Sequence, residues 1–167
     1  MATAVILVNG LPGSGKTTLG AKLAALLGCP LLSKDAVKES LADLSGPTIP
    51  GPVLGGVAMD TVWSMAAGIR DGVVIESFWF PPRDEQFARD GVARTGASKV
   101  VEVWCDVPSD VARERFGARQ RHPIHGTEFG DWAGAQPIAA WPVVRVDTTT
   151  AVDFDALLPE LASYLLA

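Results

Sequence analysis

Eight residues near the start of the chain have the types and spacing of a loop that binds nucleotide phosphates. Residues 10–17 read GLPGSGKT and match the pattern G-x-x-x-x-G-K-[ST]. In this pattern backbone N–H groups surround the phosphates, the lysine reaches the β- and γ-phosphates, and the final hydroxyl ligates Mg²⁺. Glycines allow the backbone to approach closely, and the helix that follows points its unpaired N–H groups at the anion. The predicted nucleotide-binding residues of this stretch are Gly10, Leu11, Pro12, Gly13, Ser14, Gly15, Lys16, Thr17 and Thr18.

Two carboxylates follow predicted strands and are candidates for chemistry at that phosphate. Transfer of a γ-phosphoryl group requires Mg²⁺ and a group that accepts the proton of the attacking hydroxyl. Asp35 lies in the first turn of a predicted helix, where it either binds the substrate and takes this proton or only stabilises the helix dipole. Glu76 ends an apolar run, and it either holds Mg²⁺ together with Thr17, binds substrate, or is a buried carboxylate satisfied by backbone N–H groups.

Two arginines share one face of a basic helix predicted from Ser109 to Arg121. Arg115 and Arg119 are four residues apart and therefore lie one helical turn from each other. Planar, permanently charged guanidinium groups can neutralise the charge that develops on a transferred phosphoryl group. Arg115 and Arg119 are therefore predicted to act with Lys16 in catalysis, and the alternative is a solvated basic helix.

Aromatic and histidine side chains are candidates for contacts with an organic substrate. Phe78 and Trp79 come directly after Glu76 and could line a substrate pocket. His122 and His125 lack a third histidine or a cysteine at ligand spacing, so they make a poor zinc site. Contact between His122 and the substrate is the favoured interpretation, and an ordinary exposed loop histidine is the alternative.

Strand-like and helix-like segments alternate along the chain, which predicts a parallel sheet covered by helices on both faces. The predicted strands are residues 3–9, 30–33, 73–76, 99–106 and 143–147. Helices are predicted at about 15–27, 84–95 and 109–121, around Val37–Leu44 and Met59–Ile69, and from Phe154 to Leu165. Residues 45–56 carry four glycines and three prolines, so they are predicted to form a loop that could cover a pocket. Since ligands bind at the carboxyl ends of parallel strands, the candidate residues are expected to converge there.

Length and composition limit the kind of protein this can be. The 167 residues, 48% of them hydrophobic, are interpreted as a single domain over 1–167. The net charge of −5 argues against a surface for extended nucleic acid or an anionic membrane. Cys29 and Cys105 are expected to be reduced core residues, and no apolar run reaches the roughly 18 residues of a membrane span. These features predict a cytoplasmic protein.

The chain resembles the small P-loop kinases of the zeta-toxin-like, chloramphenicol-phosphotransferase-like and gluconate-kinase-like group. The likeness rests on the motifs at residues 9–18, 33–35, 74–78 and 146–149, together with the arginine helix. It implies a nucleoside-kinase-like three-layer α/β sandwich with strand order 2-3-1-4-5, and a lid over about 108–142. It also implies that Asp35 is the catalytic base and that Arg115 and Arg119 are lid arginines. Arg115, Thr148 and Thr149 would lie beside the adenine, and many relatives carry aspartate where this chain has Glu76.

The leading hypothesis is therefore an ATP- and Mg²⁺-dependent kinase that phosphorylates a hydroxyl of a small molecule such as an antibiotic, sugar or nucleoside. A 5′-hydroxyl polynucleotide kinase is a second reading, against which the acidic net charge weighs. A third is an ATP-binding regulatory module without catalysis, which the set Lys16, Thr17, Asp35 and Glu76 disfavours.

Overall fold

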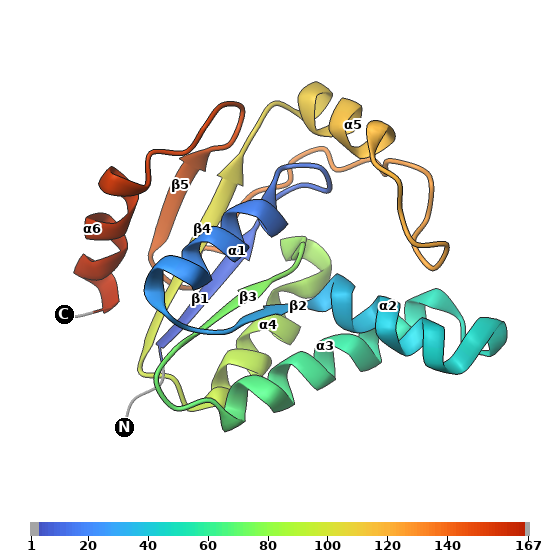
Figure 1. The fold of residues 1–167 in the computed structure, drawn as a ribbon, viewed down its shortest axis with the longest axis horizontal. Helices are drawn as coiled ribbons and strands as arrows, with labels where there is room; N and C mark the ends of the chain where they lie inside the picture. The colour runs from blue at the N-terminus through green and yellow to red at the C-terminus, as the bar shows by residue number, and fades with distance from the viewer. Residues whose placement is uncertain (1–3, 166–167) are drawn as a thin grey trace.

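Within residues 4–165, which this computed structural model describes, the chain folds around a parallel five-stranded sheet of order β2-β3-β1-β4-β5 (Figure 1). The strands are β1 (Ala4–Asn9), β2 (Leu31–Ser33), β3 (Val73–Glu76), β4 (Lys99–Asp106) and β5 (Val143–Asp147). The helices are α1 (Lys16–Leu27), α2 (Lys34–Ser45), η1 (Gly46–Thr48), α3 (Gly51–Gly68), α4 (Pro81–Thr95), α5 (Ser109–Ala118) and α6 (Phe154–Leu165). The strand order implied by the family resemblance is confirmed.

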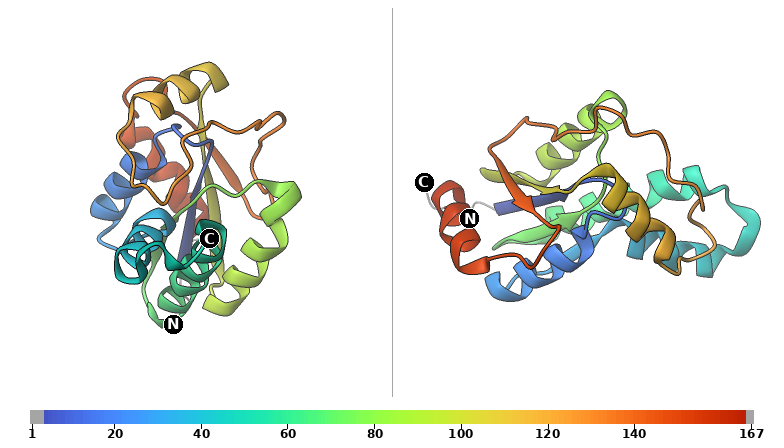
Figure 2. Two further views of the ribbon diagram at one scale, coloured as in Figure 1. Left: turned by 90° about the vertical axis from the view of Figure 1, so that its right-hand side faces the viewer. Right: turned by 90° about the horizontal axis from the view of Figure 1, so that it is seen from above.

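Alternation of side chains along β1 builds two cores, one on each face of the sheet. Ile6 and Val8 pack in a cluster with residues of α1 and α6, whereas Val5 and Leu7 pack in a cluster with residues of α3 and α4. Successive strand residues point to opposite faces, so a strand covered on both sides must be apolar throughout. Figure 2 shows α1 and α6 on one side of the sheet and α4 on the other. The predicted three-layer sandwich is confirmed.

Parallel pairing brings the carboxyl ends of the strands to one edge of the sheet. Ser33 of β2 pairs with Glu76 of β3, and Val8 of β1 pairs with the same Glu76. On the other side, Asp106 of β4 pairs with Asp147 of β5. The residues that follow these strands are therefore held close together, as expected for an open parallel sheet.

Two sequence predictions about connecting segments are wrong. Residues 51–56 are not loop but the start of α3, because Pro52 occupies a first-turn position that suits proline and a buried stripe through Leu54, Ala58 and Val62 packs the helix in place. The helix predicted to reach Arg121 ends at Ala118. Although α3 is 18 residues long, none of the helices in residues 4–165 has the length and apolar character needed to cross a bilayer.

Packing between α3 and α4 depends on a glycine. The indole of Trp63 is buried and stacks on Trp79 with ring centroids 6.2 Å apart. A Cβ placed on Gly91 of α4 would lie 2.0 Å from Cε2 of Trp63, so only glycine lets the indole occupy this position.

Substituting Gly91→Ala is expected to lower the free energy of unfolding by about 1–3 kcal/mol, since the added methyl group overpacks the core. Urea unfolding followed by tryptophan fluorescence measures the change. Gly117→Ala in α5 is the matched control, because a Cβ there meets no atom within 4 Å. It should leave stability unchanged or raise it by about 0.5–1 kcal/mol, and equal losses in both variants would contradict the packing argument.

Candidate active site

The phosphate-binding loop, residues 10–17, follows β1 and includes the first two residues of α1, and its backbone admits only glycine at a key position. Gly13 has φ 84°, and a Cβ there would lie 2.1 Å from the carbonyl oxygen of Ala112 in α5. Helix α1 begins at Lys16 with no side-chain cap on its first N–H groups, and Ser14 Oγ is buried without a hydrogen-bond partner in the part of the chain that the structure describes. Uncapped N–H groups and a helix N-terminus suit an anion.

Lys16, the first residue of α1, is a buried cation near the end of this loop. Its side chain is 8% exposed, and its Nζ donates a hydrogen bond to the carbonyl oxygen of Leu11 at 2.8 Å. Burial lowers the pKa of Lys16, and the carboxylate of Glu76 is the largest influence that opposes this lowering. The ammonium group therefore lies in a poorly solvated place, where an added anion would interact with it strongly.

Glu76 ends β3 and is 4% exposed. Its Oε2 accepts a hydrogen bond from the hydroxyl of Ser33 at 2.7 Å, and Ser33 Oγ also accepts from the N–H of Ala36 to cap α2. One interpretation of the sequence had backbone N–H groups as the hydrogen-bond donors to Glu76. The observed donor is instead the hydroxyl of Ser33, at the end of the neighbouring strand. This arrangement fixes the start of α2 relative to Glu76.

Asp35 lies in the first turn of α2, with its side chain half exposed. Its Oδ1 is 3.2 Å from Lys34 Nζ. Burial by itself raises the pKa of Asp35, but the charges of Lys34 and His125 and the hydrogen bond from Lys34 outweigh it, so the pKa is lowered. Asp35 is therefore a carboxylate at neutral pH, and it is close enough to Lys16 for each charge to influence the other's pKa.

The loop after β5 is fastened both to α5 and to the phosphate-binding loop. Arg115 donates from its two terminal nitrogens to the carbonyl oxygens of Thr148 and Thr149, at 2.8 and 2.9 Å. The hydroxyl of Thr148 donates to the carbonyl oxygen of Ser14 at 2.7 Å. The structure thus brings together the three residues predicted to lie beside the adenine, and it holds the Arg115 guanidinium on backbone carbonyls.

The sequence predicted that Arg119 and Arg115 share one helical face, and this prediction is wrong. Arg119 is the first residue beyond α5 and has extended backbone angles, φ −92° and ψ 128°. Gly117 favours this early end, because glycine weakens the last turn of a helix. The charge of the exposed Arg119 still contributes to the lowered pKa of Lys16 in the phosphate-binding loop.

The segment after α5 is held on α2 by two histidine–carboxylate pairs. His125 Nε2 is 2.8 Å from Glu39, and His122 Nε2 is 3.1 Å from Asp43. The ring of His122 accepts at Nδ1 from the N–H of Ile124, so its Nε2 carries the proton that it shares with Asp43. This part of the predicted lid therefore closes against the helix that carries Asp35.

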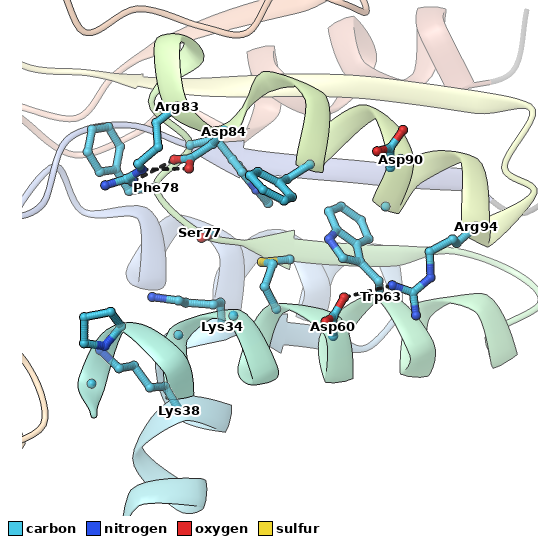
Figure 3. A pocket seen from close by; sticks show the side chains of 18 residues that line it. Lys34, Lys38, Asp60, Trp63, Ser77, Phe78, Arg83, Asp84, Asp90 and Arg94 are labelled. Carbon is cyan, nitrogen blue, oxygen red and sulfur yellow. Dashed lines mark hydrogen bonds and ion pairs between the residues drawn. The ribbon is translucent and has the colours of Figure 1, made fainter. Parts of the chain in front are cut away.

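A cavity of about 590 Å³ lies between α3 and α4 beside the end of β3 (Figure 3). Phe78 and Trp79, the predicted substrate residues after Glu76, both line it. Lys34 lies at one end, next to Asp35 in the chain. His122 does not belong to the described residues that line this cavity. It instead packs against α2 through Asp43. The volume suits a small organic molecule.

Sequence reasoning missed a fully buried carboxylate in β4. Glu102 is 0% exposed, and its Oε1 accepts from the side-chain amide of Asn9 at 2.8 Å and from the N–H of Ile138 at 3.0 Å. Its Oε2 accepts from the N–H of Ala139 at 3.0 Å, and Ala139 has φ 55°, the one positive φ of a non-glycine residue in residues 4–165. A charged residue inside an otherwise apolar strand was the available clue.

Asn9 extends this network to the phosphate-binding loop. Its Oδ1 accepts from the N–H groups of Gly10 and Trp79, at 2.7 and 3.0 Å. One side chain therefore connects Glu102, the start of the phosphate-binding loop and the floor of the cavity. We expect changes here to alter the site through position rather than through chemistry.

Replacing Glu102 with glutamine is expected to lower the free energy of unfolding by about 1–3 kcal/mol, because an NH₂ group would face a buried N–H donor that has lost its acceptor. Thermal unfolding measures this effect. Glu114→Gln, an exposed residue of α5, is the control and should leave the midpoint unchanged. A Glu102→Gln protein as stable as the control would show that the three hydrogen bonds contribute no net stability.

A comparison with family models matches residues 5–132 to an AAA domain. Uncharacterized proteins of Mycobacterium tuberculosis and Mycobacterium bovis are each 32% identical over 125 residues, which are 68% of this chain and 25% of theirs. The chain thus spans about a quarter of the length of these curated relatives.

The fold resembles those of solved structures that are named as kinases. A protein of Chloroflexus aurantiacus provisionally named a kinase has a TM-score of 0.82 and 27% identity, with 98% of this chain and 99% of that chain covered. A gluconokinase from Sinorhizobium meliloti has a TM-score of 0.62 at 20% identity, covering 98% and 91%. The Mycobacterium tuberculosis APS kinase, solved with AMPPNP and APS, has a TM-score of 0.66 at 18% identity, covering 99% of both chains. The resemblance inferred from the motifs is confirmed at the level of the fold and family.

Proposed function

The chain belongs to the AAA domain family, and from this premise we propose that it is an ATP-dependent kinase that phosphorylates a hydroxyl of a small organic molecule. One observation carries the proposal: Phe78, two residues after Glu76, and Lys34, the neighbour of Asp35, line a cavity of about 590 Å³, and the Phe78 ring centroid lies 5.9 Å from Lys16 Nζ of the phosphate-binding loop. The phosphate-binding loop, the carboxylates of Asp35 and Glu76, and a cavity large enough for an acceptor molecule are therefore neighbours. Similarity to small-molecule kinases supports the same conclusion.

The residues present fit a nucleotide with Mg²⁺. Uncapped N–H groups at the start of α1 and the unpartnered hydroxyl of Ser14 suit phosphate oxygens. In residues 4–165 no group of three or more His, Cys, Asp or Glu side chains could hold a metal ion by itself. Mg²⁺ in such sites uses one or two protein ligands together with phosphates and water, and Thr17 and Glu76 would supply these ligands.

The chain's own residues then divide the work of phosphoryl transfer. Bound ATP and Mg²⁺ supply the phosphoryl group and part of the charge neutralisation. Asp35 accepts the proton of the acceptor hydroxyl as the new O–P bond forms and the bond from Pγ to the oxygen of ADP breaks. Lys16 and Arg119 stabilise the equatorial oxygens during transfer. Arg115 and Thr148 position the nucleotide by holding the loop after β5 against the phosphate-binding loop.

A panel of hydroxyl acceptors tests the proposal. The protein is incubated with ATP and Mg²⁺ and with antibiotics, sugars, nucleosides, hydroxy acids or a 5′-hydroxyl oligonucleotide, and products are detected by mass spectrometry. We expect a phosphorylated small molecule. Transfer only to the oligonucleotide would favour a polynucleotide kinase, and tight ATP binding with no transfer to any compound would favour a regulatory module. ATP hydrolysis alone does not distinguish these, since kinases also transfer phosphate to water.

A further inference from the structure

Two lysines lie together at one end of the cavity. Lys34 and Lys38 are one turn apart on α2, and Figure 3 shows them at one end while Asp60 and Arg94 lie at the other. On α3, Gly51 and Gly55 lie beside these lysines and are again one turn apart. A Cβ on Gly51 would lie 3.7 Å from Lys38 Nζ, and one on Gly55 would lie 3.9 Å from Lys34 Nζ.

No side chain of Gly51 or Gly55 covers the two ammonium groups, although the carbonyl oxygen and Cδ1 of Ile124 would lie 3.3 and 3.7 Å from a Cβ on Gly51. A larger residue at either glycine would fill the space between α3 and the lysines. Both lysines therefore line the cavity, and Lys38 does so without an ion-pair partner among the described residues.

Apart from Lys38, the cations that line this cavity are paired with carboxylates, and Lys34 itself lies 3.2 Å from Asp35 Oδ1. Arg83 is paired with Asp84 at 2.7 Å, and Arg94 is paired with Asp60 at 3.1 Å. Paired in this way, the two arginines add little net positive charge to the cavity. A ligand charge is therefore not needed to balance them.

Lys38 differs from these arginines. Within residues 4–165 it forms no ion pair with a carboxylate, and its hydrogen bond to the carbonyl oxygen of Ile124 is long, at 3.5 Å. Burial, followed by the charge of Lys34, lowers the pKa of Lys38; Asp35 opposes the lowering and Arg121 adds to it. A partly buried cation among other cations is costly unless an anion joins it.

We propose that the acceptor carries, besides the hydroxyl that receives the phosphoryl group, a carboxylate or phosphate group that binds Lys34 and Lys38. Charge-assisted hydrogen bonds from two ammonium groups would hold this group. Lys34 also contacts Asp35 at 3.2 Å, so an anion bound there places the rest of a small molecule next to the base. This inference rests on the proposed kinase function and narrows its substrate class to small hydroxylated anions.

Binding measurements test the anion site directly. The protein is first saturated with Mg²⁺ and AMPPNP, so that the phosphate-binding loop is filled, and then titrated with inorganic phosphate, D-gluconate or the neutral D-glucitol while thermal unfolding is followed. Phosphate and gluconate are expected to raise the unfolding midpoint, and glucitol is expected to have no effect. Comparing phosphate with gluconate distinguishes a phosphate from a carboxylate as the preferred group.

Variants assign the binding to Lys38. Lys38→Met is expected to weaken anion binding about tenfold or more, whereas Lys38→Arg should retain most of it. Lys22→Met, an exposed lysine on α1, is the matched control and should bind anions as the wild type does. No anion binding by the AMPPNP complex, or equal binding by the Lys38→Met protein, would overturn the inference.

The acceptor panel separates this inference from the kinase proposal. Phosphorylation of neutral acceptors alone would overturn the anionic substrate and leave the kinase function intact. Loss of anion binding in the Lys38→Met protein, with no phosphoryl transfer to any compound, would support the anion site and refute the kinase function.

Discussion

Replacing Lys16 with methionine is expected to lower kcat/KM for phosphoryl transfer by about 10²–10³-fold, the usual effect of losing one preorganised charge at a transferred group. The same change should not lower the midpoint of thermal unfolding. Lys16 is 8% exposed, and burial disfavours its charged form. Methionine has a similar length and no charge to desolvate, which offsets the loss of the hydrogen bond from Lys16 Nζ to the carbonyl oxygen of Leu11.

This opposition between activity and stability makes the prediction specific. Lys22→Met is the control, because it removes a positive charge from the exposed side of the same helix; it should keep both activity and stability. Steady-state kinetics and calorimetry measure the two quantities. A Lys16→Met protein that binds ATP and transfers phosphate normally would show that residues 10–17 are not a nucleotide site.

Several elements could be predicted from sequence because local physics fixes them. The strand at residues 73–76 was predicted with the bounds of β3, since its residues are apolar and buried on both faces. The first helix was predicted to end at about residue 27, and it ends at Leu27, where Gly28 follows with φ 65°, a left-handed conformation that favours glycine. The order of strands came from family resemblance, because pairing of distant strands has no local signature.

Segments whose structure depends on packing were predicted poorly. The glycines at the start of α3 read as a loop, yet Leu54 and Val62 bury enough surface to keep the segment helical. That Gly51 and Gly55 lie against lysines of α2 depends on a helix–helix contact that no local pattern records. Propensity was overridden by tertiary contacts.

In the candidate site, too, features fixed by local sequence were predictable and features fixed by distant contacts were not. Residues next to strand ends, such as Asp35 and Glu76, were identifiable because parallel topology determines where strands end. Partners distant in sequence were not: Glu39 and His125 are 86 residues apart, and Asn9 and Glu102 are 93 apart. Arg119 was predicted on a helix that in fact ends before it.

Replacing Asp35 with asparagine is expected to lower kcat by about 10²–10⁴-fold, the usual contribution of a general base, with little change in ATP affinity. Asparagine has nearly the same shape and can still contact Lys34, but it cannot take up the hydroxyl proton. Single-turnover kinetics measure the chemical step, with the acceptor that the panel identifies as the substrate. Asp71→Asn, an exposed residue before β3, is the matched control and should retain full activity.

The pH dependence gives a second, independent check on Asp35. The charge of Lys34 helps to lower its pKa despite burial, so the base stays ionised below the range of an ordinary aspartate. Its contribution to kcat/KM should therefore stay constant between about pH 8 and pH 5, and be lost only as the pH falls through this lowered pKa. Lys34→Met should shift the acidic limb upward, since burial would then raise the pKa unopposed by that neighbour. Full transfer activity in the Asp35→Asn protein would assign the base to another group, and an unmoved limb in the Lys34→Met protein would show that Asp35 does not control it.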